Sequence, residues 1–245
     1  MKTNLKTIKR AALTATILAL GYTGVANAEV QQGAVKLLTA NFAPRQVVQV
    51  EVGDFHFKPG QIAPIHTHDA PAVGYVAKGA IIYQVEGEKP QVLNEGDAFY
   101  EPTDKRILRF DNASATEEAI FLDFNLEHAG EPFIVFEEAP KEAIDRRALP
   151  TIELSGELID QVDIYAHELG RSDVHRLIAN TPTLGLVSEG VIELRINGKA
   201  VNRIAAGGSF ALPKAGSEAT ITNASSEVPA KVVTFQLGAS EHLTN

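Results

Sequence analysis

The sequence of 245 residues contains no cysteine, no tryptophan and a single methionine. Without cysteine the protein can form neither a disulfide nor a thiolate metal site, and it has no cysteine nucleophile. Any metal ion must therefore bind to histidine, aspartate or glutamate. Basic residues are also scarce, since 22 Lys and Arg stand against 31 Asp and Glu. Because nucleic-acid phosphates are bound by clustered Lys and Arg, we expect no nucleic-acid partner.

Hydrophobic runs long enough to cross a membrane are missing, and the longest apolar stretch lies near the N-terminus. Residues 1–10 carry four basic side chains and no acidic one, residues 11–21 are mostly apolar, and Ala26-Asn27-Ala28 resembles a signal-peptidase site. A membrane span needs about 20 apolar residues, more than this stretch has. We therefore expect a signal peptide over residues 1–28, cleaved after Ala28, and a periplasmic or secreted protein with no membrane contact after cleavage. Losing the four basic residues would change the formal net charge from −9 to −13.

The remaining sequence repeats itself at an offset of 111 residues. Glycine and proline set the positions of turns, so their recurrence in the same order indicates the same turns in the same order. We expect two copies of one domain, over residues 29–138 and 139–245, joined by a charged segment in which residues 140–147 form a short helix. The matched pairs include Pro71 with Pro182, Gly74 with Gly185, Gly79 with Gly190, Gly87 with Gly198, Gly96 with Gly207, and Pro102 with Pro213.

Within each copy, apolar and polar residues alternate with a period of two. This pattern predicts strands with one face in a core and one face in water. Short strands of this kind, separated by turn residues, are typical of an all-β sandwich or barrel. The predicted inward-facing sets are Ile192, Leu194 and Ile196 in the second copy, and Ile81, Tyr83 and Val85 in the first. Residues 121–126 show the same alternation, with Leu122, Phe124 and Leu126 on one face and Phe121, Asp123 and Asn125 on the other.

Two segments of the first copy resemble the motifs of a known family. Residues 59–68, which end in His66-Thr67-His68, together with residues 74–79, look like the first motif of the cupins. Residues 96–102 look like the start of the second cupin motif, and residues 207–213 repeat it in the second copy. The chain resembles tandem bicupins of the type-2 cupin group. This resemblance implies two consecutive double-stranded β-helix barrels of the jelly-roll kind.

The resemblance also implies a metal site, of which this sequence retains half. Cupins hold their metal with two histidines and a glutamate from the first motif and one histidine from the second. His66 and His68 match the histidine pair, and residues two apart on a strand project from the same face. The glutamate position holds Ala72, and the histidine position of the second motif holds Ile107.

Glu101 is the candidate for the third ligand. It shares strand parity with Phe99, and its match in the second copy is Leu212, so we expect it on a buried face. A buried carboxylate is costly unless it is paired or bound to a cation. We therefore predict that His66, His68 and Glu101 bind a divalent metal, with Fe, Mn, Ni or Zn as candidates. Alternatively, Glu101 pairs with Arg106 or Arg109 or reaches solvent at the barrel mouth.

The second copy has Leu177 and Ala179 where the first has His66 and His68, so we expect no such metal site there. Tyr83 is expected to line the first barrel, where its hydroxyl either donates to a substrate or is satisfied internally. His56, between two phenylalanines, is expected to face outward, and its sequence match His167 suggests a shared structural role.

The first functional hypothesis is a metal-dependent enzyme acting on a small molecule, of the oxygenase or isomerase kind found among type-2 cupins. No organic cofactor is expected, and no separate general base is assigned. The competing hypothesis is a non-catalytic binding or structural bicupin whose metal sites have degenerated. A homodimer is a further expectation, because the outer strand face that carries Ile82 is apolar and needs cover. Alternatively, the two barrels cover each other.

Overall fold

The structure is a computed structural model that describes residues 33–240. Within this range the chain forms strands and turns and contains no helix. Accordingly, no described helix is long and apolar enough to cross a membrane. The expected signal peptide lies outside the described residues. The predicted helix over residues 140–147 is wrong, because residues 145–148 instead form a strand that pairs with the first copy.

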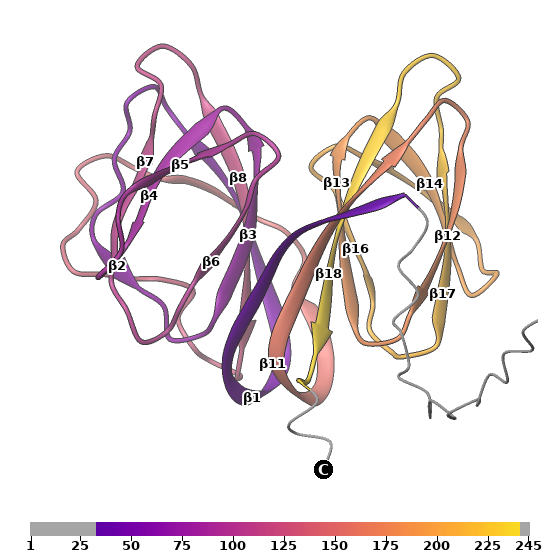
Figure 1. Cartoon of the computed structure of the whole chain (residues 1–245), viewed down its shortest axis with the longest axis horizontal. Helices are drawn as coiled ribbons and strands as arrows, with labels where there is room; N and C mark the ends of the chain where they lie inside the picture. Colours follow the sequence, from indigo (N-terminus) through magenta and orange to yellow (C-terminus); the bar gives the residue numbers. More distant parts are fainter. Residues whose placement is uncertain (1–32, 241–245) are drawn as a thin grey trace, which may run out of the picture. The chain divides into compact units, whose positions relative to one another are not determined.

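The two copies form two barrels, as the sequence predicts (Figure 1). The first copy contributes β1 (Ala34–Phe57), β2 (His66–Thr67), β3 (Ala72–Lys78), β4 (Ala80–Val85), β5 (Gln91–Asn94), β6 (Ala98–Glu101), β7 (Ile107–Asn112), β8 (Ala119–Glu127) and β9 (Val135–Phe136). The second contributes β10 (Asp145–Ala148), β11 (Ile152–Leu169), β12 (Val174–Ala179), β13 (Thr183–Glu189), β14 (Val191–Ile196), β15 (Val201–Ala205), β16 (Ser209–Leu212), β17 (Ser217–Asn223) and β18 (Ala230–Gly238).

One sheet runs through both barrels. Its hydrogen-bonded order is β16-β13-β18-β11-β1-β8-β3-β6, and β10 pairs with β1 beside this path. A sheet of order β5-β4-β7-β2-β9 completes the first barrel, and a sheet of order β12-β17-β14-β15 completes the second. The described residues therefore form an all-β structure of two tandem barrels that share backbone hydrogen bonds.

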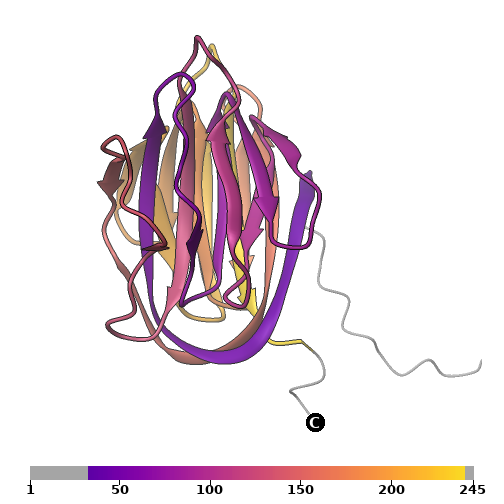
Figure 2. The same ribbon diagram turned by 90° about the vertical axis from the view of Figure 1, so that its left-hand side faces the viewer.

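The long strands β1 and β11 make this shared sheet possible. The C-terminal half of β1 pairs with β8 of its own barrel, while its N-terminal half pairs with β11 of the other barrel. The register between β1 and β11 is irregular from Asn41 to Arg45 and from Val47 to Gln49. Such bulges bend a strand, and β1 is strongly bent in Figure 2. Strands from before residue 138 therefore pair with strands from after residue 139, across the boundary that the sequence predicts between the two copies.

Strand β8 has two buried faces, which corrects one expectation. Leu122, Phe124 and Leu126 are buried as predicted, but they pack against the second copy rather than inside their own barrel. In this core between the barrels, Phe124 meets its match Phe235 with ring centroids 4.3 Å apart. The face expected to be outward instead lines the first barrel and carries Phe121, Asp123 and Asn125, all of which are buried.

The other predicted alternations are confirmed. Ile81, Tyr83 and Val85 belong to the core inside the first barrel, and Ile192 and Leu194 belong to the core inside the second. Ile82 does not belong to the core between the barrels. The contact between the two copies therefore covers the outer face of β8 and not the strand face that carries Ile82.

The two matched glycines Gly74 and Gly185 show why the repeat keeps the same small residues. A Cβ atom at Gly74 would clash with the ring of Phe99, and one at Gly185 would clash with the ring of Phe210. Each glycine directly faces that phenylalanine across an antiparallel pair. In both barrels, a phenylalanine ring thus packs directly against the backbone of a glycine.

His167 is not the structural counterpart of His56. Phe55 pairs with Phe121, whereas His167 pairs with Val232, the residue that matches Phe121 in the second copy. His167 therefore occupies the interior position of Phe55. His56 faces outward from the barrel core, as expected, and contacts acidic side chains. The shared role suggested by the sequence is wrong, because the offset between the copies changes by one residue in their first strand.

We predict that Phe235→Ala lowers the free energy of unfolding of the whole protein by about 3–5 kcal/mol. The substitution would leave a cavity beside Phe124 in the core that both copies share. Chemical denaturation followed by circular dichroism measures the change. Because the sheet and this core join the barrels, a single transition is expected, and a second transition left at the wild-type midpoint would contradict the prediction.

Acid should destabilise the second barrel through His167. Burial lowers the pKa of His167 to about 4, and the charge of His175 adds to the shift. Between pH 6.5 and about 4 the unfolded chain therefore takes up this proton while the folded chain does not, so stability falls as pH falls. Relative to His167→Gln, wild type should lose on the order of 3 kcal/mol across this window. Parallel unfolding curves of both proteins at several pH values measure it, and equal pH dependence would contradict it.

Candidate metal centre

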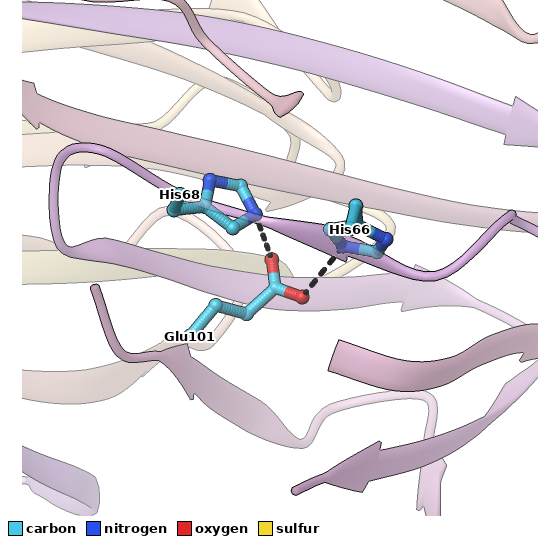
Figure 3. A group of neighbouring side chains, drawn as sticks. All are labelled: His66, His68 and Glu101. Atoms are coloured by element: carbon cyan, nitrogen blue, oxygen red, sulfur yellow. Dashed lines mark ion pairs between the residues drawn. The ribbon is translucent and has the colours of Figure 1, made fainter. Parts of the chain in front are cut away.

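The structure brings the three predicted ligands together inside the first barrel. His66 lies in β2, His68 follows that strand directly, and Glu101 ends β6. Their side chains point toward one another (Figure 3), with His66 Nε2 3.4 Å from Glu101 Oε1 and His68 Nε2 3.3 Å from Glu101 Oε2. One donor atom from each residue lies within 4.8 Å of the others. The residues are only 3%, 1% and 2% exposed, so the group is sealed from solvent.

Glu101 enters the site from the strand next to the one that carries the expected glutamate position. That position holds Ala72 in β3, and Ala72 pairs directly with Glu101 in β6. Directly opposed residues of antiparallel strands share a face, with Cβ atoms about 4.5–5.5 Å apart. The carboxylate of Glu101 thus reaches the region that a glutamate at position 72 would occupy, and the small side chain of Ala72 leaves room for it.

Hydrogen bonds orient both imidazole rings. Nδ1 of His66 lies 2.8 Å from the carbonyl oxygen of Pro64, and Nδ1 of His68 lies 3.3 Å from Oδ1 of Asn125. Because these oxygens only accept hydrogen bonds, both Nδ1 atoms donate and both Nε2 atoms face the carboxylate. The amide of Asn125 is itself oriented, since its Nδ2 donates to the carbonyl oxygen of Phe133 at 2.6 Å.

The charges of His68 and Glu101 shift the pKa of each residue in the direction opposite to the effect of burial. Burial lowers the pKa of His68, but the Glu101 carboxylate outweighs it and raises that pKa to about 9. Burial raises the pKa of Glu101, yet the charge of His68 and the nearby imidazole of His66 lower it to about 2. Without a metal ion, His68 and Glu101 therefore form a buried ion pair at neutral pH. A metal ion that binds Nε2 of His68 displaces its proton.

Several alternatives for these residues are excluded by the geometry. Arg106 pairs with Glu86 and Glu137, and Arg109 pairs with Asp111, so neither arginine neutralises Glu101. Glu101 does not reach solvent.

Ile107, at the position of the missing fourth ligand, pairs with His66 across β7 and β2 and is fully buried. At the site's counterpart in the second barrel, Leu177, Ala179 and Leu212 are all buried in its apolar core.

The hydroxyl of Tyr83 is satisfied within the protein, the second of the two alternatives that the sequence left open. It donates a short hydrogen bond to the carbonyl oxygen of Tyr100. Burial raises the pKa of Tyr83, and the negative charge of Glu101 adds to the shift.

The space beside the ligands is small and mostly aromatic. A cavity of about 20 Å³ touches His66, Glu101 and Asp123, and its remaining walls include Phe55, Phe57, Phe110, Phe121 and Phe136. This volume holds roughly one water molecule. Phe136 of β9 covers His66, with ring centroids 5.8 Å apart. In this conformation the cavity has room for about one water molecule and not for an organic substrate.

Asp123 is a buried polar residue inside the first barrel, and Arg146 is a partly exposed one that packs against its core. The sequence pattern indicates neither as part of the site. Burial and the charge of Glu101 raise the pKa of Asp123 to about 8, so it holds a proton at neutral pH. Arg146 comes from β10 of the second copy and lies over the ring of Phe133, with its guanidinium carbon 3.7 Å from the ring centroid. The signal that could have found Asp123 is Phe121 on the same strand face, because a large apolar residue there indicates that this face also lies in a core.

Comparisons with known proteins agree with this geometry. Residues 53–125 match the family model described as a cupin domain. The match places a cupin domain in the first barrel. With a second barrel beside it, the chain has the fold of a bicupin, as its sequence motifs suggest. The comparison with curated proteins found no match.

Solved structures share the fold of this bicupin at low sequence identity. AerE from Microcystis aeruginosa is 12% identical with a TM-score of 0.55, over 80% of this chain and 99% of that one. A salicylate 1,2-dioxygenase from Pseudaminobacter salicylatoxidans is 14% identical with a TM-score of 0.53, over 77% and 71%. Procruciferin, an 11S globulin from Brassica napus, is 10% identical with a TM-score of 0.55, over 87% and 86%. An oxygenase and a globulin thus share this fold, which by itself does not determine the function.

The donor atoms of the bicupin fit a divalent metal. His68 Nε2 and Glu101 Oε1 are buried atoms without a hydrogen-bond partner. The imidazole nitrogens lie 3.4 and 3.3 Å from the two carboxylate oxygens, and one donor atom from each residue lies within 4.8 Å of the others. The three residues are therefore close enough to bind a single ion. Two histidines and one carboxylate, with further positions open, form a ligand set typical of Fe(II) and acceptable to other divalent metals.

We expect Asn125→Leu to weaken metal binding about 10- to 100-fold, because His68 loses the acceptor that orients it. The affinity for Zn(II) is measured by competition with a chromophoric chelator. The matched control is Gln236→Leu at the equivalent position of the second barrel, which should keep wild-type affinity. Equal affinity of Asn125→Leu and wild type would show that Asn125 does not position His68.

Proposed function

We propose that this bicupin is a divalent-metal-dependent enzyme whose active site lies in the first barrel, on His66, His68 and Glu101. The observation that carries the proposal is that two buried atoms, Nε2 of His68 and Oε1 of Glu101, have no hydrogen-bond partner. Both imidazoles already donate through Nδ1, so in their neutral forms they present lone pairs to a carboxylate. Such an arrangement is stable only with a proton or a metal ion among these atoms.

The chain's own residues suit small-molecule chemistry at such an ion. When bound, the metal supplies a Lewis acid or a redox centre. His66, His68 and Glu101 would supply three protein ligands, which would leave positions for water and substrate oxygen. The aromatic walls exclude bulk water, and Asp123 holds a proton on the wall of the same cavity. Among reaction classes we favour an oxygenase or an isomerase, and Fe(II) is the preferred metal given the ligand set.

A non-catalytic bicupin is the second candidate, and the small cavity favours it. A volume of about 20 Å³ leaves no room for an organic substrate unless a wall moves. One such wall is the segment around β9, which contributes Ile134 and Phe136 and whose strand pairing with β2 involves only two residues.

We also propose export to the periplasm or beyond, on the evidence of the basic and apolar stretches before Ala28. Mass spectrometry of the N-terminus of the mature protein tests it. A mature chain that begins at Glu29 is expected, and a chain that retains Lys2 to Arg10 would contradict the proposal.

Metal content is the first test of the enzyme proposal. After incubation with Fe(II), Mn(II), Ni(II) or Zn(II) and desalting, wild type should retain about one equivalent of metal. The His66→Ala, His68→Ala double variant and Glu101→Leu should retain almost none. The matched control is the His56→Ala, Glu118→Leu double variant, which removes an outward histidine and carboxylate 3.2 Å apart and should bind normally. Equal, near-zero metal in wild type and in the double variant would refute the site.

Turnover is the second test. Fe(II)-loaded wild type should consume O₂ or isomerise a member of a panel of small phenols, hydroxy acids and keto acids, and Glu101→Leu should not. Metal binding with no turnover of any member would favour the non-catalytic bicupin.

A further inference from the structure

A second, larger cavity lies at the end of the first barrel. Its volume is about 630 Å³, within the range of small-molecule sites. One wall is the N-terminal part of β1, and the others are the ends of β4, β5 and β6 with the turn at residues 102–105. The N-terminal part of β1 is held there by pairing with β11, since Leu38 pairs with Ile164 and Asn41 with Gln161. The second copy therefore positions a wall of this cavity.

The lining of this cavity favours an uncharged aromatic molecule. Four aromatic rings line it, from Phe42, Tyr83, Phe99 and Tyr100. Neutral hydrogen-bonding groups come from Asn41, Gln91 and Thr103. Its charged side chains are two acids, Glu88 and Asp104, and one base, Lys105. An anion would meet an excess of negative charge, whereas a neutral ring with a hydroxyl group would find both stacking surfaces and hydrogen-bond partners.

The aromatic core inside the first barrel lies between this cavity and the metal centre. Tyr83 and Phe99 line the cavity and also belong to this core. The hydroxyl of Tyr83 donates to the carbonyl oxygen of Tyr100, and Tyr100 directly precedes the proposed ligand Glu101 in β6.

We propose that the cavity lined by Phe42, Tyr83 and Tyr100 binds small uncharged aromatic compounds of the phenol type and is the substrate's entrance to the metal centre. The role as an entrance rests on the proposed function, whereas binding itself does not require a metal. Tyr83 then separates the entrance from Glu101. The corresponding residues of the second copy, Leu194 and Ala211, have no ring at the places of Tyr83 and Tyr100.

Binding is tested on the metal-free protein with three probes of similar size: phenol, benzoate and cyclohexanol. NMR titration should show that phenol binds more tightly than both the anionic and the non-aromatic probe. Tyr100→Ala, which copies the second barrel, should weaken phenol binding about 2- to 10-fold. Tyr165→Ala, which removes a tyrosine outside the cavity, is the matched control and should bind like wild type. Benzoate binding as tightly as phenol, or unchanged phenol binding by Tyr100→Ala, would overturn the proposal.

The entrance is tested by the rate at which 1,10-phenanthroline, an uncharged aromatic chelator, removes Co(II) from the loaded protein. Tyr83→Leu, which copies Leu194 of the second barrel, should accelerate removal several-fold without reducing the Co(II) content before the chelator is added. Phenol in excess should slow removal from wild type. An unchanged rate in Tyr83→Leu would refute the entrance. If Co(II) does not bind at all, the proposed function fails, while the phenol titration still decides whether the cavity is a binding site.

Discussion

The constraint on which the rest of this protein depends is the burial of both faces of β8. One face packs into the core between the barrels, where Phe124 meets Phe235, and the other lines the first barrel. Burying both faces requires the second copy to lie against the first, and the shared sheet through β1 and β11 holds it there. The second barrel has an apolar interior, and its contact with β8 buries the outer face of a strand that lines the first barrel.

The same arrangement explains how the first barrel keeps a ligand set with two family positions lost. Ala72 faces Glu101 across β3 and β6, so a carboxylate from the neighbouring strand takes the place of the missing glutamate. Asn125 on β8 orients His68, and Arg146 reaches the same barrel from the second copy. The candidate metal ligands therefore depend on contacts that come from both copies. The second barrel lacks the ligand residues, but this does not make it dispensable.

Much of the fold follows from residues that act locally. Matched glycines and prolines indicate the repeat. Period-two alternation predicts strands such as β4 and β14, which the structure contains. Glu101 could be recognised as buried because the second copy has Leu212 at its place. The helix over residues 140–147 and the outward face of Asp123 and Asn125 were mispredicted for one reason. Both segments contact a partner more than ten residues away in sequence, and local patterns carry no information about such partners.

The amino-acid pattern alone predicts an all-β repeat, excludes thiolate chemistry and indicates the two histidines with the glutamate as a candidate donor set. Those results depend on residue types and on spacing within single strands. Only the tertiary structure decided that Glu101 lies opposite Ala72, that Nδ1 of each histidine is already engaged, and that a larger cavity lies behind Tyr83. These features arise where strands distant in sequence meet, because register and packing between strands, rather than the pattern within one, place the side chains.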